Sequence, residues 1–231
     1  MNIKKLIGAL FAYFYKLYDF VAFAVYPPYC VQCRKFLGKR SVFCDDCMLS
    51  IQPIVTVPLH VTKKWIVPVI AVSAYKEPLK RLILAKGRSD YVAAYHLGQL
   101  IWERTSICNA TIDYIVPIPL YWRRYARRGY NQAEQIAQFL AKKSGGLVSK
   151  KLKRMKNTKF QSQCNGKERA SNVRDSFSLF VKGKNQFKNK HILLVDDLMT
   201  TGSTLSSAVR ELIKSNPASI TAVVACRVTQ S

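Results

Sequence analysis

Ribose- and phosphate-binding chemistry is concentrated in residues 192–205, Ile-Leu-Leu-Val-Asp-Asp-Leu-Met-Thr-Thr-Gly-Ser-Thr-Leu. The adjacent carboxylates of Asp196 and Asp197 can accept hydrogen bonds from the two hydroxyls of a ribose, and their oxygens also suit Mg²⁺. Hydroxyl donors flank Gly202 at the expected start of a helix; they are Thr200, Thr201, Ser203 and Thr204. Unpaired N–H groups at a helix start favour a phosphate, and a glycine lets the backbone approach it closely. The run therefore predicts a phosphorylated-ribose site, the alternative being an acidic strand end before an ordinary capped helix.

Metal-binding chemistry is predicted near the N-terminus by two C-x-x-C motifs, made by Cys30 with Cys33 and by Cys44 with Cys47. Four thiolates complete a closed tetrahedral zinc shell, which leaves no open position for catalysis. We therefore expect a structural Zn²⁺, the alternatives being a redox pair or chance spacing. The three other cysteines are scattered, so the set of seven fits a reducing, cytoplasmic compartment better than a disulfide framework.

The charge balance predicts an anionic partner. The chain has 37 Lys and Arg against 13 Asp and Glu, a net charge of +24. Residues 121–190 alone hold 19 Lys and Arg and three acidic residues. Cations and aromatic rings alternate in one part of this segment, at Trp122, Arg123, Arg124, Tyr125 and Tyr130. This mixture favours single-stranded nucleic acid, the alternative being a solubilising surface.

The elements that must position these residues follow an α/β pattern. We expect strands at residues 66–75, 113–120, 192–195 and 219–228, and helices from Pro78, at 91–104, from Asn131 to the glycines at 145–146, and at 205–214. Glu134 stands in capping-box position relative to Asn131. Residues 149–176 show no apolar period and are predicted to form a long loop. Alternating strands and helices favour a mainly parallel sheet.

Three parts are expected along the chain. Residues 1–27 predict an aromatic-rich helix, residues 28–58 a four-cysteine zinc module, and residues 59–231 the α/β domain. The apolar stretch in residues 6–26 is interrupted by Lys16 and Asp19. It therefore favours a helix that packs on the protein or contacts a membrane surface through residues 1–28, with a spanning anchor as the alternative.

Residues 195–204 closely resemble the phosphoribosyl pyrophosphate (PRPP) loop of type I phosphoribosyltransferases. Further elements resemble the ComF family, competence-associated proteins in which a four-cysteine zinc module precedes a phosphoribosyltransferase domain. These elements are Pro-Ile-Pro-Leu at 117–120, Arg-Gly-Tyr-Asn-Gln at 128–132, Thr158 with Gln161, Arg169 with Asn172 and Val173, and Phe177. The resemblance covers residues 28–228. One departure is Cys164, where the family pattern usually has Leu, and we expect a packing role for it.

The resemblance implies roles for the individual residues. Asp196 and Asp197 would bind the ribose of PRPP with Mg²⁺, and residues 200–204 would bind the 5-phosphate. The turn that contains Pro119 would lie on the pyrophosphate side. Residues from the basic segments would close over the site; they are Arg127, Arg128, Gln161, Arg169 and Asn172.

Two functions follow from these patterns. The charge and the resemblance favour binding of phosphoribosyl groups and single-stranded DNA, in DNA uptake and handling during natural transformation. A DNA-uptake helicase or membrane channel at the inner face of the membrane is then the expected protein partner. The alternative is an active phosphoribosyltransferase that transfers ribose 5-phosphate from PRPP to a nucleobase-like acceptor.

Overall fold

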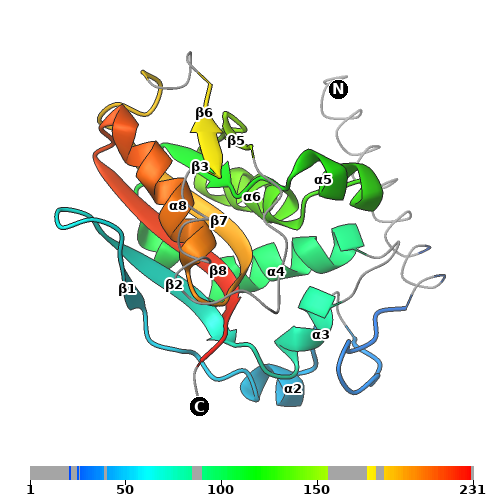
Figure 1. Ribbon diagram of the computed structural model, residues 1–231. Coiled ribbons are helices and arrows are strands. Elements are labelled where there is room, and N and C mark those ends of the chain that lie inside the picture. The colour runs from blue at the N-terminus through cyan, green and yellow to red at the C-terminus, as the bar shows by residue number, and fades with distance from the viewer. Residues whose placement is uncertain are drawn as a thin grey trace, which may run out of the picture. The chain divides into compact units, whose positions relative to one another are not determined.

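The computed structural model describes residues 27–38, 41–84, 90–155, 176–180 and 185–229, with Val21 and Val25 (Figure 1). The chain divides into two compact units, Met1–Ser50 and Ile51–Ser231. Most of the predicted N-terminal helix lies outside the described residues, within which Val21 and Val25 are helical and exposed. No helix in the described ranges combines the length and hydropathy that a membrane span requires.

The first unit is held by short local elements. A bridge between Tyr29 and Phe36 closes the first C-x-x-C turn, and their rings meet edge to face at 5.9 Å. Arg34 lies in this turn with a φ of 64°. The second C-x-x-C motif begins helix α2 (Asp45–Leu49), with Cys44 as its N-cap. Each motif is therefore fixed by its own backbone geometry.

The second unit is built on a six-stranded sheet. Across the sheet the order is β1 (Val57–His60), β2 (Ile66–Ala74), β8 (Ser219–Arg227), β7 (His191–Met199), β3 (Tyr114–Pro117) and β4 (Leu147–Val148). Only β1 and β2 are antiparallel among these neighbours. A separate antiparallel pair is formed by β5 (Leu152–Arg154) and β6 (Phe177–Leu179). The predicted α/β class with a mainly parallel sheet is confirmed.

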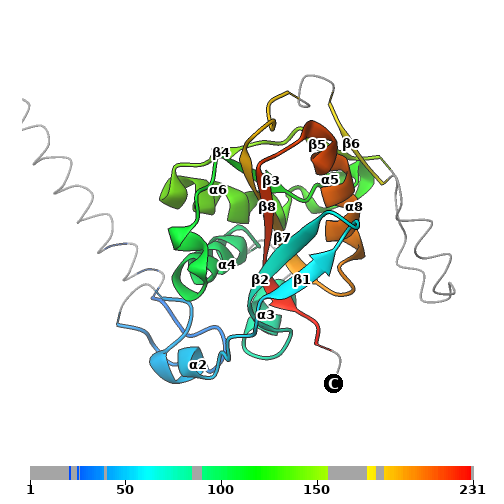
Figure 2. The same cartoon turned by 90° about the vertical axis from the view of Figure 1, so that its left-hand side faces the viewer.

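Helices cover both faces of this sheet. The helices of the second unit are α3 (Leu79–Leu84), α4 (Asp90–Arg104), α5 (Trp122–Arg128), α6 (Gln132–Ser144) and α8 (Ser203–Leu212), with 3₁₀ turns η1 (Ser106–Asn109) and η3 (Ile213–Ser215). Figure 2 shows α4 and α6 on one side of the sheet and α8 on the other. From α8, Leu205, Val209 and Leu212 are buried in a cluster with Leu194 of β7. Each such side chain stabilises the fold by roughly 1.5–3 kcal/mol.

The elements in the structure differ from the predicted ones in three places. Strand β7 runs to Met199 rather than to Val195, because β8 continues to pair with it. Residues 122–128 form helix α5, which the sequence had not predicted. Residues 152–154, expected in a loop, pair with β6. The predicted boundary between residues 58 and 59 falls inside β1.

Candidate functional site

Asp196 and Asp197, the acidic pair, lie in β7 just beyond the point where β3 stops pairing with it. Strand β3 pairs with β7 only as far as Val195, which lies opposite Pro117, whereas β8 accompanies β7 to Met199. The chain leaves β3 toward α6 and β4 but leaves β7 toward α8 and β8, so it turns to opposite sides of the sheet here. Ligands of open α/β sheets bind at such a switch point, beyond the carboxyl ends of the strands.

The two carboxyl groups of the acidic pair differ in environment. Asp196 is only partly exposed and is surrounded by protein, and this loss of water, together with the nearby charge of Asp197, raises its pKa well above the ordinary value. Its Oδ1 atom accepts a hydrogen bond from the N–H of Asp197 at 2.9 Å. Two carboxylates held close together gain from a cation or from hydroxyl donors between them.

Residues 200–204, the phosphate loop, join β7 to α8. Gly202 is the N-cap of α8 and has a φ of 75°, a backbone conformation that favours glycine. A Cβ atom on Gly202 would lie 2.8 Å from Met199 Cε and 3.0 Å from Leu59 Cδ1. The hydroxyls of Thr201 and Ser203 lie 3.1 Å apart on the exposed side of the loop. The loop thus presents hydroxyls beside the N–H groups that begin a helix, as anion binding requires.

Residues 117–120, the proline turn, are anchored on both sides. The N–H of Ile118 donates to the carbonyl oxygen of Val195 at 2.8 Å, directly before the acidic pair. The carbonyl oxygen of Ile118 accepts from Asn131 Nδ2 at 2.9 Å. Pro119 follows, half-buried. The turn is therefore held beside the acidic pair by β7 and by the first residue before α6.

Asn131 caps α6 as predicted, because its Oδ1 accepts from the N–H of Ala133 at 3.2 Å. Glu134, expected to complete a capping box, instead forms a salt bridge with Lys150. The adjoining Gln132 is buried, and its Nε2 has no hydrogen-bond partner within the part of the chain that the structure describes. The side chain of Gln132, one residue after the asparagine that holds the proline turn, therefore keeps an unpaired donor among the described residues.

Helix α5 exposes most of its aromatic and basic side chains. Trp122 and Tyr125 are 61% and 47% exposed, and the Arg123 guanidinium lies 5.2 Å from the Trp122 ring. Arg127 and Arg128 are also exposed, whereas Arg124 is half-buried. Gly129 ends the helix with a φ of 77°. The helix thus presents rings and cations to solvent directly after the proline turn.

Tyr130 does not join this exposed group. It is only 8% exposed, and its ring packs against Tyr91 of α4 at 5.1 Å. The prediction that Tyr130 could stack on a nucleobase is corrected, because the ring is already covered by the protein. Its place beside Asn131 makes it part of the packing that positions the proline turn.

Arg154 is a site residue that the sequence did not indicate. Its guanidinium lies 5.5 Å from the ring of Phe177, the residue opposite it on β6. Burial lowers the pKa of Arg154, as does the charge of Arg124, and the charge of Asp196 opposes this. Arg154 of β5 is therefore within electrostatic reach of both Arg124 of α5 and Asp196 of β7. Nothing in the local sequence around Arg154 distinguishes it from the neighbouring lysines.

Strands β5 and β6 bracket the segment predicted to close over the site. The N–H of Met155 donates to the carbonyl oxygen of Ser176 at 2.8 Å, so the two ends of residues 156–175 are held together. Gln161, Arg169 and Asn172 lie outside the described residues. The described residues that flank this segment, Met155 and Ser176, adjoin Arg154 and Phe177.

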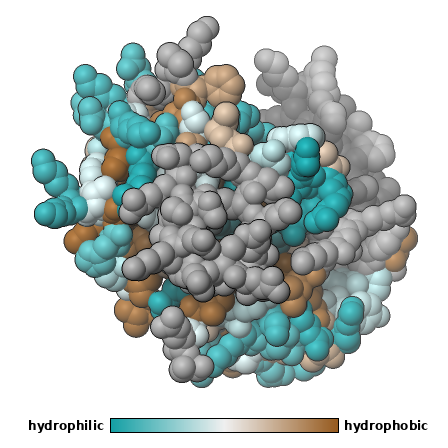
Figure 3. Space-filling view, in the orientation of Figure 1, coloured by the Kyte–Doolittle hydropathy of each residue, from teal (hydrophilic) through white to brown (hydrophobic). Residues whose placement is uncertain are grey.

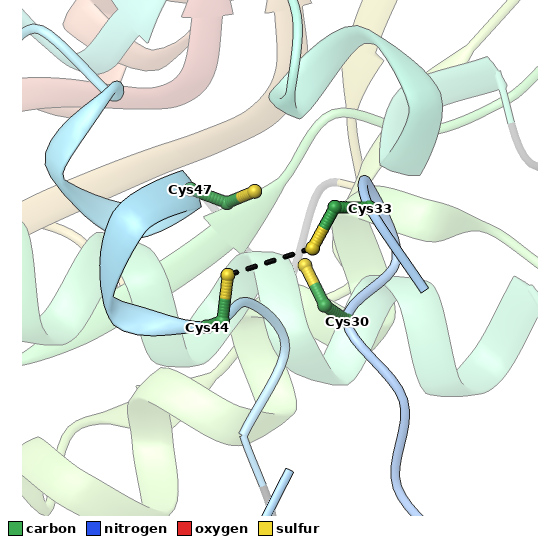
Figure 4. A group of neighbouring side chains, drawn as sticks. All are labelled: Cys30, Cys33, Cys44 and Cys47. Atoms are coloured by element: carbon green, nitrogen blue, oxygen red, sulfur yellow. Dashed lines mark hydrogen bonds between the residues drawn. The ribbon is translucent and has the colours of Figure 1, made fainter. Parts of the chain in front are cut away.

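The four predicted metal ligands are brought together in the first unit. The sulfur atoms of Cys30, Cys33, Cys44 and Cys47 all lie within 4.8 Å of one another (Figure 4). The sulfur atoms of Cys33 and Cys44 are 3.6 Å apart, too far for a disulfide. Four sulfurs placed tetrahedrally about 2.3 Å from one ion lie about 3.8 Å apart. The four cysteines are therefore close enough together to hold one metal ion.

Two of these thiols have strongly shifted pKa values. Burial of Cys30 opposes its ionisation, but the backbone N–H groups of Cys33, Cys44 and Gln32 outweigh this and lower its pKa to about 6. Burial and the neighbouring sulfurs raise the pKa of Cys47 to about 12. One thiolate thus forms readily, and the crowded others gain from a cation that neutralises them.

Comparison with known proteins identifies the second unit. Residues 96–231, more than half of the chain, match the phosphoribosyl transferase domain family. Among solved structures, glutamine PRPP amidotransferase from Bacillus subtilis aligns with 58% of this chain and 26% of its own, with 16% identity and a TM-score of 0.40.

Curated relatives extend the similarity over both units. Competence protein F of Haemophilus influenzae is 33% identical over 81% of this chain and 79% of its own. DNA utilization protein YhgH of Salmonella typhi is 29% identical over 86% of this chain and 83% of its own. Competence protein ComFC of Bacillus subtilis is 37% identical over 45% and 40%. With a four-cysteine cluster ahead of a phosphoribosyltransferase domain, the chain belongs to the ComF family.

Proposed function

We propose that this protein binds a phosphoribosyl group at the carboxyl edge of its sheet and single-stranded DNA along helix α5, in the uptake and use of DNA. The observation that carries the proposal is the place of α5. It follows the proline turn, carries exposed Trp122 and Tyr125, and lies close enough for the charge of Arg124 to lower the pKa of Arg154. Names of relatives, which refer to competence and to DNA utilization, support the same role.

Phosphoribosyl binding is supported by the order of groups along the edge. The phosphate loop lies at the start of α8, the acidic pair immediately precedes it, and the proline turn lies on the β3 side of the acidic pair. The 5-phosphate and the pyrophosphate of the ligand need hydrogen-bond donors, and the ribose diol between them needs acceptors. The carboxylates and a bound phosphate would also hold Mg²⁺.

DNA binding is supported by charge as well as by the rings. A small diphosphate does not need a protein with a net charge of +24, whereas each cation near a polyanion adds affinity through counterion release. Figure 3 shows hydrophilic side chains over much of the described surface that faces the viewer, with smaller hydrophobic patches between them. Exposed rings beside arginines stack unpaired bases without regard to sequence.

The metal in the four-cysteine cluster is proposed to be Zn²⁺, because the four sulfurs lie within 4.8 Å of one another and four thiolates are its preferred structural shell. A closed shell of this kind stabilises a small unit rather than acting on substrate. Thiolate ligands and free cysteines fit the reducing interior of a cell, so a cytoplasmic location is proposed as well.

The DNA proposal is tested by titrating a fluorescent single strand with the full-length protein at several salt concentrations. We expect affinity to fall steeply with salt, and Trp122→Ala with Tyr125→Ala to weaken binding by roughly tenfold or more. The matched control is Lys63→Ser with Lys64→Ser, which removes two exposed cations from the opposite edge of the sheet. Flat salt dependence, or equal losses in both variants, would refute the role of α5.

Transfer of ribose 5-phosphate to an acceptor is the second candidate, and the acidic pair beside the phosphate loop favours it. The site would position the reacting groups and stabilise charge that develops on the ribose. Incubation with PRPP, Mg²⁺ and a panel of bases, followed by a pyrophosphate assay, decides between the two. Base-dependent release of pyrophosphate would establish the transferase.

A further inference from the structure

The outer side of helix α4 carries two tyrosines that lie one helical turn apart. Tyr91 and Tyr95 are each more than half exposed, and Val92 beside them is exposed as well. The inner side of the helix, with Leu97 and Ile101, is fully buried in the second unit. The two exposed rings therefore add little to the core, and their position leaves them open to a partner.

These tyrosines extend a row of aromatic side chains that begins at the end of α5. The centres of the Tyr130 and Tyr91 rings are 5.1 Å apart. One turn further along α4, the Tyr95 ring meets Phe139 of α6 edge to face, with the ring centres 4.9 Å apart. Tyr130 stands two residues after Arg128, the last residue of α5, so at most about 7 Å separates their Cα atoms. The row therefore leads from the exposed cations of α5 onto α4.

Close packing of α4 on α6 supports the second half of this row. A Cβ atom on Gly98 would lie 2.9 Å from the Cβ atom of Phe139, so a glycine is needed for the two helices to approach this closely. Phe139 is buried, and Tyr95 lies against it. The ammonium group of Lys143 lies 5.8 Å from the centre of the Phe139 ring. Tyr95 is therefore held on a packed surface, with a cation near its support.

The charges beside these rings favour an anionic partner. Lys142 and Lys143 are exposed in the last turn of α6. Residues 91–102 and 135–143 contain no acidic residue. The acidic residues of the two helices stand outside these ranges, at Asp90, Glu103 and Glu134. Rings with cations beside them bind a chain that carries both flat bases and phosphates, whereas an apolar protein partner would have to desolvate the lysines.

We propose that Tyr91 and Tyr95 form a second stacking surface for single-stranded DNA, which the strand reaches by passing over the end of α5. The inference rests on the proposed binding of DNA along α5 and adds the path of the strand beyond that helix. Positions one turn apart lie about 6 Å apart along the helix axis, so each ring can take one base of an unstacked strand. Stacking of this kind requires unpaired bases and tolerates any sequence.

The test is titration of a fluorescent single strand of about fifteen nucleotides with the full-length protein. Tyr91→Leu and Tyr95→Leu keep an apolar side chain in place but remove the flat ring, and each should weaken binding roughly fivefold or more. The slope of affinity against salt should stay unchanged in both variants, because no phosphate contact is lost. Tyr91→Phe and Tyr95→Phe, which keep the rings, should bind as wild type does.

A matched control is Phe180→Leu, at an exposed ring directly after β6, the strand that Glu211 of α8 holds through a hydrogen bond. This variant should bind as wild type does. Loss of affinity in the double variant of α5, but not in Tyr91→Leu or Tyr95→Leu, would overturn the second surface and leave the first intact. An equal loss in Phe180→Leu, or a wild-type dimer that the Leu variants dissociate in sedimentation, would also overturn it. Failure of wild type to bind the strand would refute both proposals.

Discussion

The side chain of Asn131 joins the proline turn to helix α6: Nδ2 donates to the carbonyl oxygen of Ile118 at 2.9 Å, and Oδ1 accepts from the N–H of Ala133 at 3.2 Å. Asn131 is 7% exposed, so both bonds are made away from water. The Ile118 peptide is bonded through its N–H to Val195. One buried amide therefore fixes the turn beside the acidic pair.

Asn131→Ala should destabilise the protein by about 1–3 kcal/mol, because it removes a helix cap and leaves a buried carbonyl without its donor. Asn131→Asp keeps the cap, but it places a carboxylate oxygen against the buried carbonyl oxygen of Ile118, so it should destabilise the protein as well. Chemical denaturation measures both losses. The exposed Asn109→Ala on η1 is the control, and an equal effect of Asn109→Ala and Asn131→Ala would contradict this role.

Gly202→Ala should weaken phosphate binding beyond its effect on stability. The methyl group would lie 2.8 Å from Met199 Cε in a backbone with a φ of 75°. Gly145→Ala is a matched control, because Gly145 has a φ of 78° with nothing within 4 Å. Both variants should lose about 1 kcal/mol or more of stability from the backbone alone. Only Gly202→Ala should lose affinity for ribose 5-phosphate, and a loss in both would contradict a specific role of the loop.

Asp196→Asn should stabilise the free protein while impairing ligand binding. Because burial raises the pKa of Asp196 above its ordinary 3.8, folded wild type retains a proton that the unfolded chain releases as pH rises. Wild-type stability should therefore fall as pH increases from 3.8 toward the raised value, and the variant should lack this fall. We expect a Tm higher by on the order of a few degrees at neutral pH and little difference below pH 3.8.

Thermal scans across pH check the Asp196→Asn prediction. Asp45→Asn, at an exposed carboxylate of α2, serves as the control and should leave the profile unchanged. A lower Tm of Asp196→Asn at neutral pH would show that the carboxylate stabilises the free fold rather than being retained for a ligand.

Metal removal should affect the two units differently. A chelator, or acid strong enough to protonate the bound thiolates, should unfold the four-cysteine unit, because protons compete with the metal for thiolates. The unit Ile51–Ser231 has its own buried core and should keep its cooperative unfolding and its affinity for ribose 5-phosphate. Metal analysis with circular dichroism follows this, and simultaneous loss of both units would contradict a structural metal confined to the first.

The strongly patterned elements could be predicted from the sequence. Strand β7 and helix α8 combine an apolar run, an acidic pair and an amphipathic helix, and the cysteine spacing predicted the cluster in Figure 4. Helix α5 was missed because Trp122–Arg128 has no apolar period. The helix ends at Gly129, which adopts a left-handed backbone conformation. Strands of three residues, as in β5 and β6, are too short to show a period.

Long-range relationships in the site could not be read from the sequence. The electrostatic influence of Asp196 on Arg154 depends on pairing between β5 and β6, which are separated by more than twenty residues. Tyr130 looked like an exposed ring because its neighbours are cations, but Tyr91 of α4 covers it. Such contacts depend on how elements far apart in the sequence pack together, so local composition does not predict them.

The phosphoribosyl site is tested most directly by calorimetric titration with PRPP and Mg²⁺. Wild type should bind one equivalent. Asp197→Asn with Thr201→Ala should abolish the binding, because the acidic pair loses one negatively charged carboxylate and the phosphate loop loses a hydroxyl donor. Glu103→Gln with Thr111→Ala, at exposed positions in α4 and in the segment before β3, should bind as wild type does. Unchanged binding by the Asp197 and Thr201 variant would contradict the assignment of residues 196–204 as the site.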